Sequence, residues 1–304
     1  MREEFLRTEI EGHLLHRLII HPAQGVDVSA VAIFYHGQGD YAERYLNVLH
    51  PFVDRGVRCI ITELPGHGHS PGVRGHCGDV HLLDAVIQST LEHANNSTDL
   101  PYGVMGHSMG GLLAARHLVL AGQGSLPIPS FAWLSSPLVD PSRGRHPVFL
   151  RAARLLSPIV PALTFSTHVK PENFNASATD ESPRVEATIE GECITKSDLW
   201  HNRVSLGWGT SLLDFAELVS ENVKDIPESI ALLCTQGKAD PVCPAALTKR
   251  LFDRLPNGNK RYEEIEELRH EPFSGAGSEQ LFQTLDDWVG SLSILTSQQE
   301  KTPT

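Results

Sequence analysis

The feature that most constrains the fold is an alternation of short apolar runs with longer segments of helical periodicity. From residue 30 onward the apolar runs have the composition of buried strands, and segments of helical length separate them. This alternation predicts a mostly parallel sheet with helices on both faces, preceded by an antiparallel pair at residues 5–10 and 13–21. The predicted strands are 30–37, 57–64, 102–108, 130–137, 229–237 and 260–268, and the predicted helices are 41–55, 79–94, a segment after residue 108, 244–255 and 278–292.

The segment 138–226 interrupts the alternation. It contains proline-rich joints, a basic helix candidate at residues 145–160 and an acidic stretch at residues 179–192. An insertion between two strands of an open α/β sheet lies over the strand ends, where such folds bind ligands. We therefore expect an α/β core formed by residues 1–137 and 227–295, an inserted helical lid at 138–226 and a flexible tail at 296–304.

The stretch PYGVMGHSMGG contains a candidate nucleophile, Ser108, between Gly106 and Gly110. A short apolar run precedes it and a helical segment follows it, which is the strand, turn and helix context of the G-x-S-x-G nucleophile elbow. The two glycines leave room where a Cβ atom would collide with neighbouring backbone. A pattern of five residues also arises by chance, so its partners must decide whether Ser108 is catalytic.

Asp240 and His270 are the candidate partners of Ser108. Each follows a predicted strand, and the chain order serine, acid, histidine is the one expected for this architecture. A serine hydroxyl needs a base to take its proton, and the base needs a carboxylate to orient it. Two alternatives remain open: Asp240 could cap the helix that starts near Pro244, and His270 is one of 16 histidines.

The oxyanion that forms when Ser108 attacks a carbonyl needs two hydrogen-bond donors already in place. The backbone N–H of Met109 is one candidate because it follows the nucleophile at the start of a helix. The backbone N–H of Gln38, in the stretch HGQGD after the strand at 30–37, is the second. The alternative for HGQG is an ordinary turn.

These motifs resemble the α/β-hydrolases grouped with monoacylglycerol lipases, lysophospholipases and serine aminopeptidase-like (S33) hydrolases. The stretch HGQGDYAERY is similar to the HG-x-G-E-H-x-x-R-Y block of that family, and ELPGHGHSPGVRGH to its D-x-x-G-H-G-x-S-x-G-x-R-G-H block. GHSMGG, LLCTQGKADPVCP and RHEPF are similar to its elbow, acid and histidine blocks. The resemblance spans about residues 10–290 and is weakest in the lid. Asp40, Tyr41, Glu63 and Pro272 depart from the pattern.

The resemblance implies an α/β-hydrolase fold with an eight-stranded sheet, and hydrolysis of carboxylic esters of lipid-like alcohols through an acyl intermediate on Ser108. It implies no organic cofactor and no metal. The same triad also serves amidases, aminopeptidases and carbon–carbon bond hydrolases, and a non-catalytic binding member of the fold is a further alternative.

The bulk composition restricts partners and location. The formal net charge of −12 argues against a nucleic-acid partner, and a small lipid-like ester is the expected one. Five scattered cysteines without a C-x-x-C pair, and an N-terminus without a signal-peptide pattern, predict a cytoplasmic protein. The oligomeric state stays open.

Two further patterns have competing interpretations. The basic, apolar helix candidate at 145–160 either packs over the acyl pocket, which we favour, or contacts a membrane surface. His67 and His69 form an H-x-H pair, with His76, Cys77, Asp79 and His81 soon after; metal binding there is disfavoured because Ser70 and Pro71, rather than a ligand, follow the pair.

Overall fold

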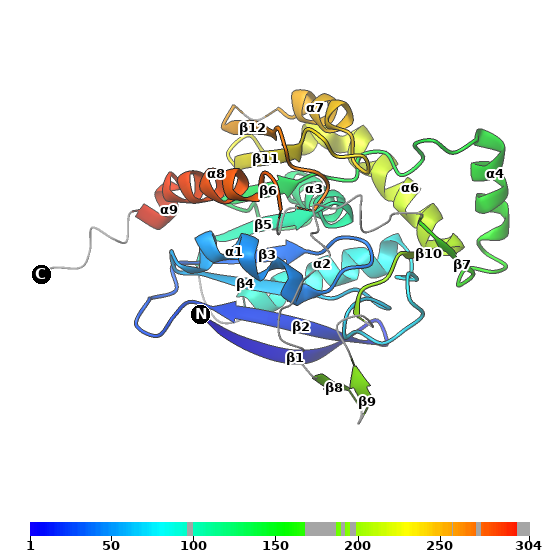
Figure 1. Cartoon of the computed structure of the whole chain (residues 1–304), viewed down its shortest axis with the longest axis horizontal. Coiled ribbons are helices and arrows are strands. Elements are labelled where there is room, and N and C mark those ends of the chain that lie inside the picture. The colour runs from blue at the N-terminus through cyan, green and yellow to red at the C-terminus, as the bar shows by residue number, and fades with distance from the viewer. Residues whose placement is uncertain are drawn as a thin grey trace, which may run out of the picture.

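An eight-stranded sheet forms the centre of the computed structural model, which describes residues 1–95, 100–167, 187–189, 192–194, 199–256, 258–271 and 275–296. The strand order is β1-β2-β4-β3-β5-β6-β11-β12 (Figure 1). Strand β2 runs antiparallel to both its neighbours, and every pairing from β4 to β12 is parallel, as the sequence predicts. The strands are β1 Arg2–Ile10, β2 His13–His21, β3 Ala30–Tyr35, β4 Val57–Thr62, β5 Tyr102–His107, β6 Phe131–Ser135, β11 Ala231–Gly237 and β12 Lys260–Ile265.

Burial along the strands explains their place in the sheet. Every residue of β3, β5 and β6 is buried, as expected for central parallel strands covered on both faces. Strand β1 alternates exposed and half-buried residues, which suits an edge strand with one face in water. Packing on both faces therefore fixes the positions of the carboxyl ends of the central strands.

Two helical layers cover the two faces of the sheet. One apolar cluster joins the sheet to α1, α8 and α9, and the other joins it to α2, α3, α6 and α7. Helices α1 and α8 contact each other over the first face, and α3 contacts α6 over the second. The helices are η1 Ala42–Tyr45, α1 Leu46–Val53, α2 Val80–Asn95, α3 Met109–Gly122, α6 Leu206–Asn222, η3 Val223–Asp225, α7 Ala245–Arg254, α8 Ser278–Gly290 and α9 Ser293–Thr296.

The segment between β6 and β11 contains two different kinds of element. Helix α4 (Pro147–Leu156) buries only Ala153 and projects beyond the sheet (Figure 1), whereas α6 buries Trp208 and Phe215 fully in the core. The described strands of this segment are short: β7 Thr164–Ser166 pairs with β10 Arg203–Ser205, and β8 Ala187–Ile189 pairs with β9 Glu192–Ile194. The boundaries 138–226 stay a prediction for a lid, and most of the acidic stretch lies outside the described residues.

The two ends of the chain differ in how far the structure describes them. The antiparallel pair predicted at residues 5–10 and 13–21 is confirmed: β2 has the predicted bounds, and β1 begins earlier, at Arg2. The predicted tail at 296–304 lies, apart from its first residue, outside the described residues. In the described part of the chain, no helix combines the length and the apolar composition needed to cross a bilayer.

Candidate active site

Ser108 occupies the sharp turn between β5 and α3. Its backbone dihedrals, φ 56° and ψ −118°, lie in a region that side chains other than glycine rarely adopt. The Ser108 N–H donates to the Ser135 carbonyl at 2.9 Å, and the Ser108 carbonyl accepts from Leu112 and Leu138. These bonds hold the strained turn, so the hydroxyl projects from the end of β5.

The glycines on either side of Ser108 are required by close packing. A Cβ atom on Gly106 would lie 2.1 Å from the Gly110 carbonyl oxygen, and one on Gly110 would lie 1.8 Å from the Tyr35 carbonyl oxygen. Both separations are far below van der Waals contact. The prediction that these glycines make room for the turn is confirmed.

The structure brings Ser108, Asp240 and His270 together. His270 Nε2 lies 2.9 Å from Ser108 Oγ, and His270 Nδ1 lies 2.8 Å from Asp240 Oδ2. The three residues are 7%, 6% and 5% exposed. With Nδ1–H donating to the Asp240 carboxylate, Nε2 is left free to accept the Ser108 proton, which is the arrangement that general-base catalysis needs.

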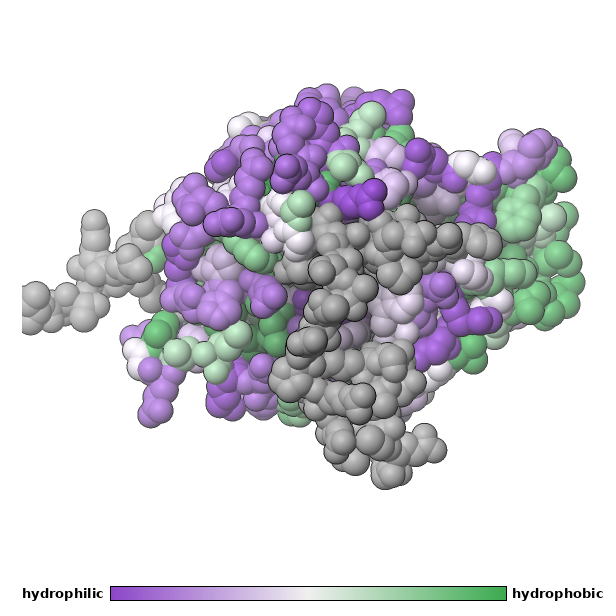
Figure 2. Space-filling view, in the orientation of Figure 1, coloured by the Kyte–Doolittle hydropathy of each residue, from purple (hydrophilic) through white to green (hydrophobic). Residues whose placement is uncertain are grey.

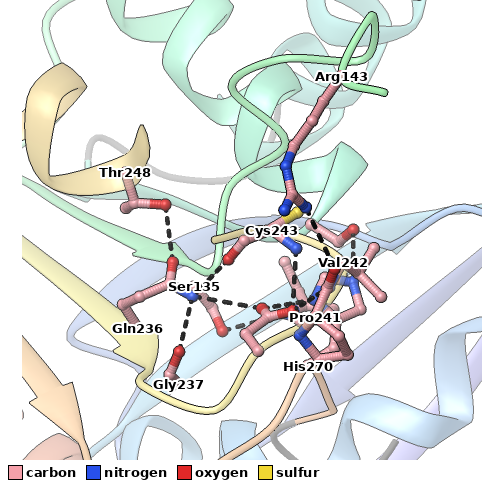
Figure 3. A network of polar contacts seen from close by, with 12 residues as sticks. Ser135, Arg143, Gln236, Gly237, Pro241, Val242, Cys243, Thr248 and His270 are labelled. Atoms are coloured by element: carbon pink, nitrogen blue, oxygen red, sulfur yellow. Dashed lines mark hydrogen bonds and ion pairs between the residues drawn. The ribbon is translucent and has the colours of Figure 1, made fainter. Parts of the chain in front are cut away.

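Asp240 is fixed by a dense set of hydrogen bonds from Gln236, Val242 and Cys243, which Figure 3 labels. Its Oδ1 accepts from the backbone N–H groups of Val242 and Cys243 at 2.8 and 2.9 Å, and Gln236 Nε2 donates to its Oδ2 at 3.3 Å. Helix α7 starts later, with Pro244 at its N-cap and no side-chain cap. Asp240 therefore closes the turn before α7 and does not cap the helix itself.

The loop after β3 carries Gln38, one of the two predicted oxyanion donors. Gln38 lines the same cavity as Ser108, and its side chain is held by Trp208 Nε1, which donates to Oε1 at 2.6 Å, and by the Arg203 carbonyl, which accepts from Nε2 at 2.7 Å. Met109 is the first residue of α3, so its N–H has no partner within the helix. The side chain of Met109 is buried in the core.

A buried ionic network connects the Gln38 loop to the loop of His270. Arg44 forms ion pairs with Asp40 and with Glu271, the residue after His270. Tyr45 Oη accepts from the Gly37 N–H at 2.7 Å and donates to Asp40 Oδ2 at 2.8 Å. Sequence reasoning did not assign this network; its only signal is the HG-x-G-E-H-x-x-R-Y block, which contains Arg44 and Tyr45.

Burial and charge together set the ionisation of this network. Burial opposes the charge of Arg44, but Asp40 and Glu271 outweigh it and raise the pKa of the guanidinium. Burial raises the pKa of Glu271, and Arg44 partly offsets that effect. Two carboxylates close to His270 therefore share one buried cation.

Two more buried groups lie next to the catalytic candidates. Burial lowers the pKa of His107 well below its usual value, with His270 adding to the effect, so His107 is neutral. His107 Nδ1 lies 3.1 Å from Ser135 Oγ. Burial raises the pKa of the Cys243 thiol, and a hydrogen bond with Ser108 partly opposes this. Cys243 is thus an uncharged thiol against the candidate nucleophile.

A cavity of about 430 Å³ opens over Ser108 and His270. Its wall is mixed: the Gln38 loop and the ionic network form a polar side, while residues from α4 and α6 form an apolar side. The apolar lining includes Leu138, Phe149, Leu150, Ala153, Leu206, Leu212, Leu213 and Val242. This volume is within the range of small-molecule sites.

Two groups of side chains among the described residues hold potential metal ligands within 4.8 Å of one another. One is Asp240, Cys243 and His270, which shares the catalytic candidates, and the other is His16, Glu63 and His69. The H-x-H pair is split between different partners. His69 faces Glu63 and Glu43, whereas His67 Nδ1 lies 3.3 Å from the Cys77 thiol.

Sequence relatives cover most of the chain. The chain is 25% identical over 267 residues to a monoacylglycerol lipase of Mycolicibacterium smegmatis, covering 87% of this chain and 89% of that protein. It is 27% identical over 256 residues to phospholipase YtpA of Bacillus subtilis, covering 83% and 92%. It also matches an uncharacterized abhydrolase domain-containing protein of Dictyostelium discoideum at 27% identity, covering 86% of this chain but only 26% of that longer protein.

Solved structures show the same fold. The monoacylglycerol lipase of Paleococcus ferrophilus superposes with a TM-score of 0.72 at 22% identity, covering 91% of this chain and 98% of that one. The α/β-hydrolase fold expected from the sequence is thereby confirmed. Residues 27–275 match the family model described as Serine aminopeptidase, S33. This match extends over most of the chain and includes the Ser108 elbow, so the protein belongs to the serine aminopeptidase S33 family of α/β-hydrolases.

Proposed function

We propose that the protein hydrolyses carboxylic esters of lipid-like alcohols and that Ser108 carries the acyl group during the reaction. The observation that carries the proposal is the continuous hydrogen-bonded chain from Asp240 through His270 to Ser108 at the base of a partly apolar cavity. Ester hydrolysis is supported by family membership and by relatives named monoacylglycerol lipase and phospholipase.

The proposed reaction begins when His270 Nε2 takes the Ser108 proton as the oxygen attacks the ester carbonyl. The N–H groups of Gln38 and Met109 would stabilise the oxyanion, and Asp240 would steady the imidazolium. His270 then gives its proton to the leaving alcohol. Water repeats the attack on the acyl-Ser108 ester and releases the acid.

The shape and lining of the cavity support a lipid-like acyl group. The apolar side contributed by α4 and α6 suits an aliphatic chain, whose burial is worth roughly 0.8 kcal/mol per CH₂ group. Because α4 forms part of this wall, residues 138–226 would act as a lid over the acyl group. Exchanging Leu212 for a larger side chain, such as Phe, should shorten the preferred chain.

A serine-directed probe provides the first test. A fluorophosphonate should label the wild-type protein and spare Ser108→Ala, whereas equal labelling of both would exclude Ser108 as the nucleophile. A panel of p-nitrophenyl esters should show rates that vary with acyl length. A preference for aminoacyl amides over all esters would assign the protein to the amidase alternative instead.

The outer surface of α4 and of the turn after it supports a transient contact with lipid surfaces. Leu155 and Ile159 are 77% and 74% exposed, and Figure 2 shows apolar surface gathered over this end of the molecule. Phe149 and Leu150 of the same helix line the cavity, so one helix would meet both lipid and substrate. Flotation with anionic liposomes tests the contact, and Leu155→Glu should abolish it. If the wild-type protein stays in solution instead of floating with the liposomes, the proposed lipid contact is wrong.

Cysteine chemistry supports a reducing location. The cysteines whose side chains the structure describes, Cys59, Cys77, Cys234 and Cys243, are free and buried. Free thiols are typical of cytoplasmic proteins, and we place the enzyme there. Cell fractionation would test this placement, and recovery with an extracellular fraction would contradict it.

A further inference from the structure

Two arginines at the mouth of the cavity have no carboxylate partner among the described residues. Arg143 and Arg145 both line the cavity, and both are exposed. Other arginines near the site are paired: Arg44 with Asp40 and Glu271, and Arg154 with Asp214 and Glu217. In a chain with net charge −12, this leaves a local positive charge at the entrance to the site.

Arg143 extends from the segment after β6 toward the catalytic loop. Its Nη1 donates to the Pro241 carbonyl at 3.3 Å, as Figure 3 shows. Pro241 directly follows Asp240, whose Oδ2 lies 2.8 Å from Nδ1 of the catalytic candidate His270. A single bond to Pro241 leaves four of the five guanidinium N–H groups for a ligand close to the nucleophile.

Arg145 is placed beside the acyl wall of the cavity. Its guanidinium carbon lies 5.8 Å from the centre of the Phe149 ring, within cation–π range, and Phe149 lines the cavity. Gly144 separates the two arginines with a φ of 74°, and the Arg145 N–H closes a turn onto the Ser142 carbonyl at 3.0 Å. The two cations therefore belong to one tight turn at the cavity rim.

The charges around the cavity are distributed unevenly. On the side of His270, Asp40 and Glu271 share the single cation Arg44. Arg143 and Arg145 line the same cavity with one nearby carboxylate, Asp140, whose Oδ1 accepts from the Ser142 N–H at 2.9 Å. An anionic substrate group would be repelled by the pair of carboxylates and attracted to the two arginines.

We infer that Arg143 and Arg145 form an anion-binding subsite that recognises a phosphate group on the alcohol part of the ester. The inference rests on the proposed function, because it takes the acyl chain to lie along the apolar wall and so leaves the alcohol at the rim. Guanidinium groups suit phosphate because they offer two parallel N–H donors to two oxygens. The preferred substrates would then be acylglycerol phosphates over neutral acylglycerols.

Binding of two ether lipids tests the subsite without requiring hydrolysis. The ligands are 1-O-dodecylglycerol 3-phosphate and 1-O-dodecylglycerol, titrated calorimetrically below their micelle concentrations. Charge-assisted hydrogen bonds should make the phosphate bind about tenfold more tightly to the wild type. Arg143→Gln should bring the two dissociation constants within about twofold, and Arg143→Lys should keep part of the difference because it keeps the charge.

Two controls separate the subsite from general electrostatics. Arg250→Gln removes an equal charge from the exposed face of α7, outside the cavity lining, and should leave the tenfold preference intact. Raising the salt concentration from about 0.05 to 0.5 M should weaken phosphate binding more than binding of the neutral ether, because exposed charges are screened. Circular dichroism melting curves verify that each variant is folded.

Equal affinity of the two ethers for the wild type, or an unchanged preference in Arg143→Gln, would overturn the inference. The corresponding dodecanoyl esters report separately on the proposed function. If the ethers discriminate but neither ester is hydrolysed, the hydrolase proposal fails and the subsite stands. If both esters are cleaved while the ethers bind equally, the subsite fails and the hydrolase proposal stands.

Discussion

Replacing Arg44 with Met should strongly destabilise the protein, because Arg44 is the cation shared by two buried carboxylates. The side chains of Asp40 and Glu271 are 10% and 5% exposed, and that of Arg44 is 20% exposed. Methionine keeps most of the length of the side chain but provides neither charge nor donors. The substitution therefore leaves two carboxylates buried near each other without compensation.

The expected loss is about 3–5 kcal/mol in the free energy of unfolding, the usual cost of breaking a buried ion pair by removing one partner. Arg154 offers a matched control because it also contacts two carboxylates, Asp214 and Glu217. In that cluster all three side chains are at least 52% exposed. Arg154→Met should therefore cost only about 0–1 kcal/mol.

The pH dependence of this deficit has a definite sign. Burial raises the pKa of Glu271, and removing Arg44 takes away the interaction that lowers it. A carboxyl group with a raised pKa in the folded state contributes stability at low pH, which is lost as the pH rises through that pKa. The deficit of Arg44→Met should thus be largest at neutral pH and should shrink toward acid.

Urea unfolding followed by circular dichroism, at about pH 5 and pH 8, measures both effects. Arg44→Met/Glu271→Gln should recover part of the stability at pH 8, because one uncompensated charge is gone. If Arg44→Met costs no more than Arg154→Met at pH 8, or if its deficit grows toward acid, the network does not stabilise the fold as reasoned.

Three further perturbations follow from the same geometry. Gly110→Ala should prevent folding or cost several kcal/mol, because its Cβ would lie 1.8 Å from the Tyr35 carbonyl oxygen; a normal melting curve would contradict this. Asp240→Asn should lower kcat by roughly 10⁴-fold with the fold retained, because an amide no longer selects the His270 tautomer; a loss below about tenfold would argue against the orienting role. Burial raises the pKa of Glu43 to about 7, with Glu63 adding to the effect, so its ionisation destabilises the folded protein as the pH rises from about 5 to 8. Glu43→Gln should gain stability relative to wild type over that range, by at most about 3 kcal/mol in urea titrations, and a constant difference would refute the assignment.

Local patterns were sufficient to predict the sheet and the three catalytic candidates. The run PYGVMGHSMGG has strand, turn and helix signals within a dozen residues, and Asp240 and His270 each follow a strand whose apolar run is clear. Parallel strands place their carboxyl ends at one edge of the sheet, so residues at those ends meet even when 162 positions separate them. This rule predicts that Ser108 and His270 lie close together in the folded protein.

The supporting contacts could not be obtained in this way. Arg44 and Glu271 are 227 residues apart, and neither has a local pattern that distinguishes a buried ion pair from a solvated charge. The path of residues 138–226 was equally hard to predict, because the segment mixes α6, which packs on α3, with α4, which is mostly exposed. Amphipathic periodicity alone cannot distinguish these two environments.

The most direct test of acyl transfer to Ser108 is mass spectrometry of the protein quenched in acid within milliseconds of mixing with a p-nitrophenyl ester. We expect one acyl group per chain on the peptide that contains Ser108, and no adduct with Ser108→Ala or His270→Ala. An acyl group on another residue, or full turnover by Ser108→Ala, would contradict the assignment of the nucleophile.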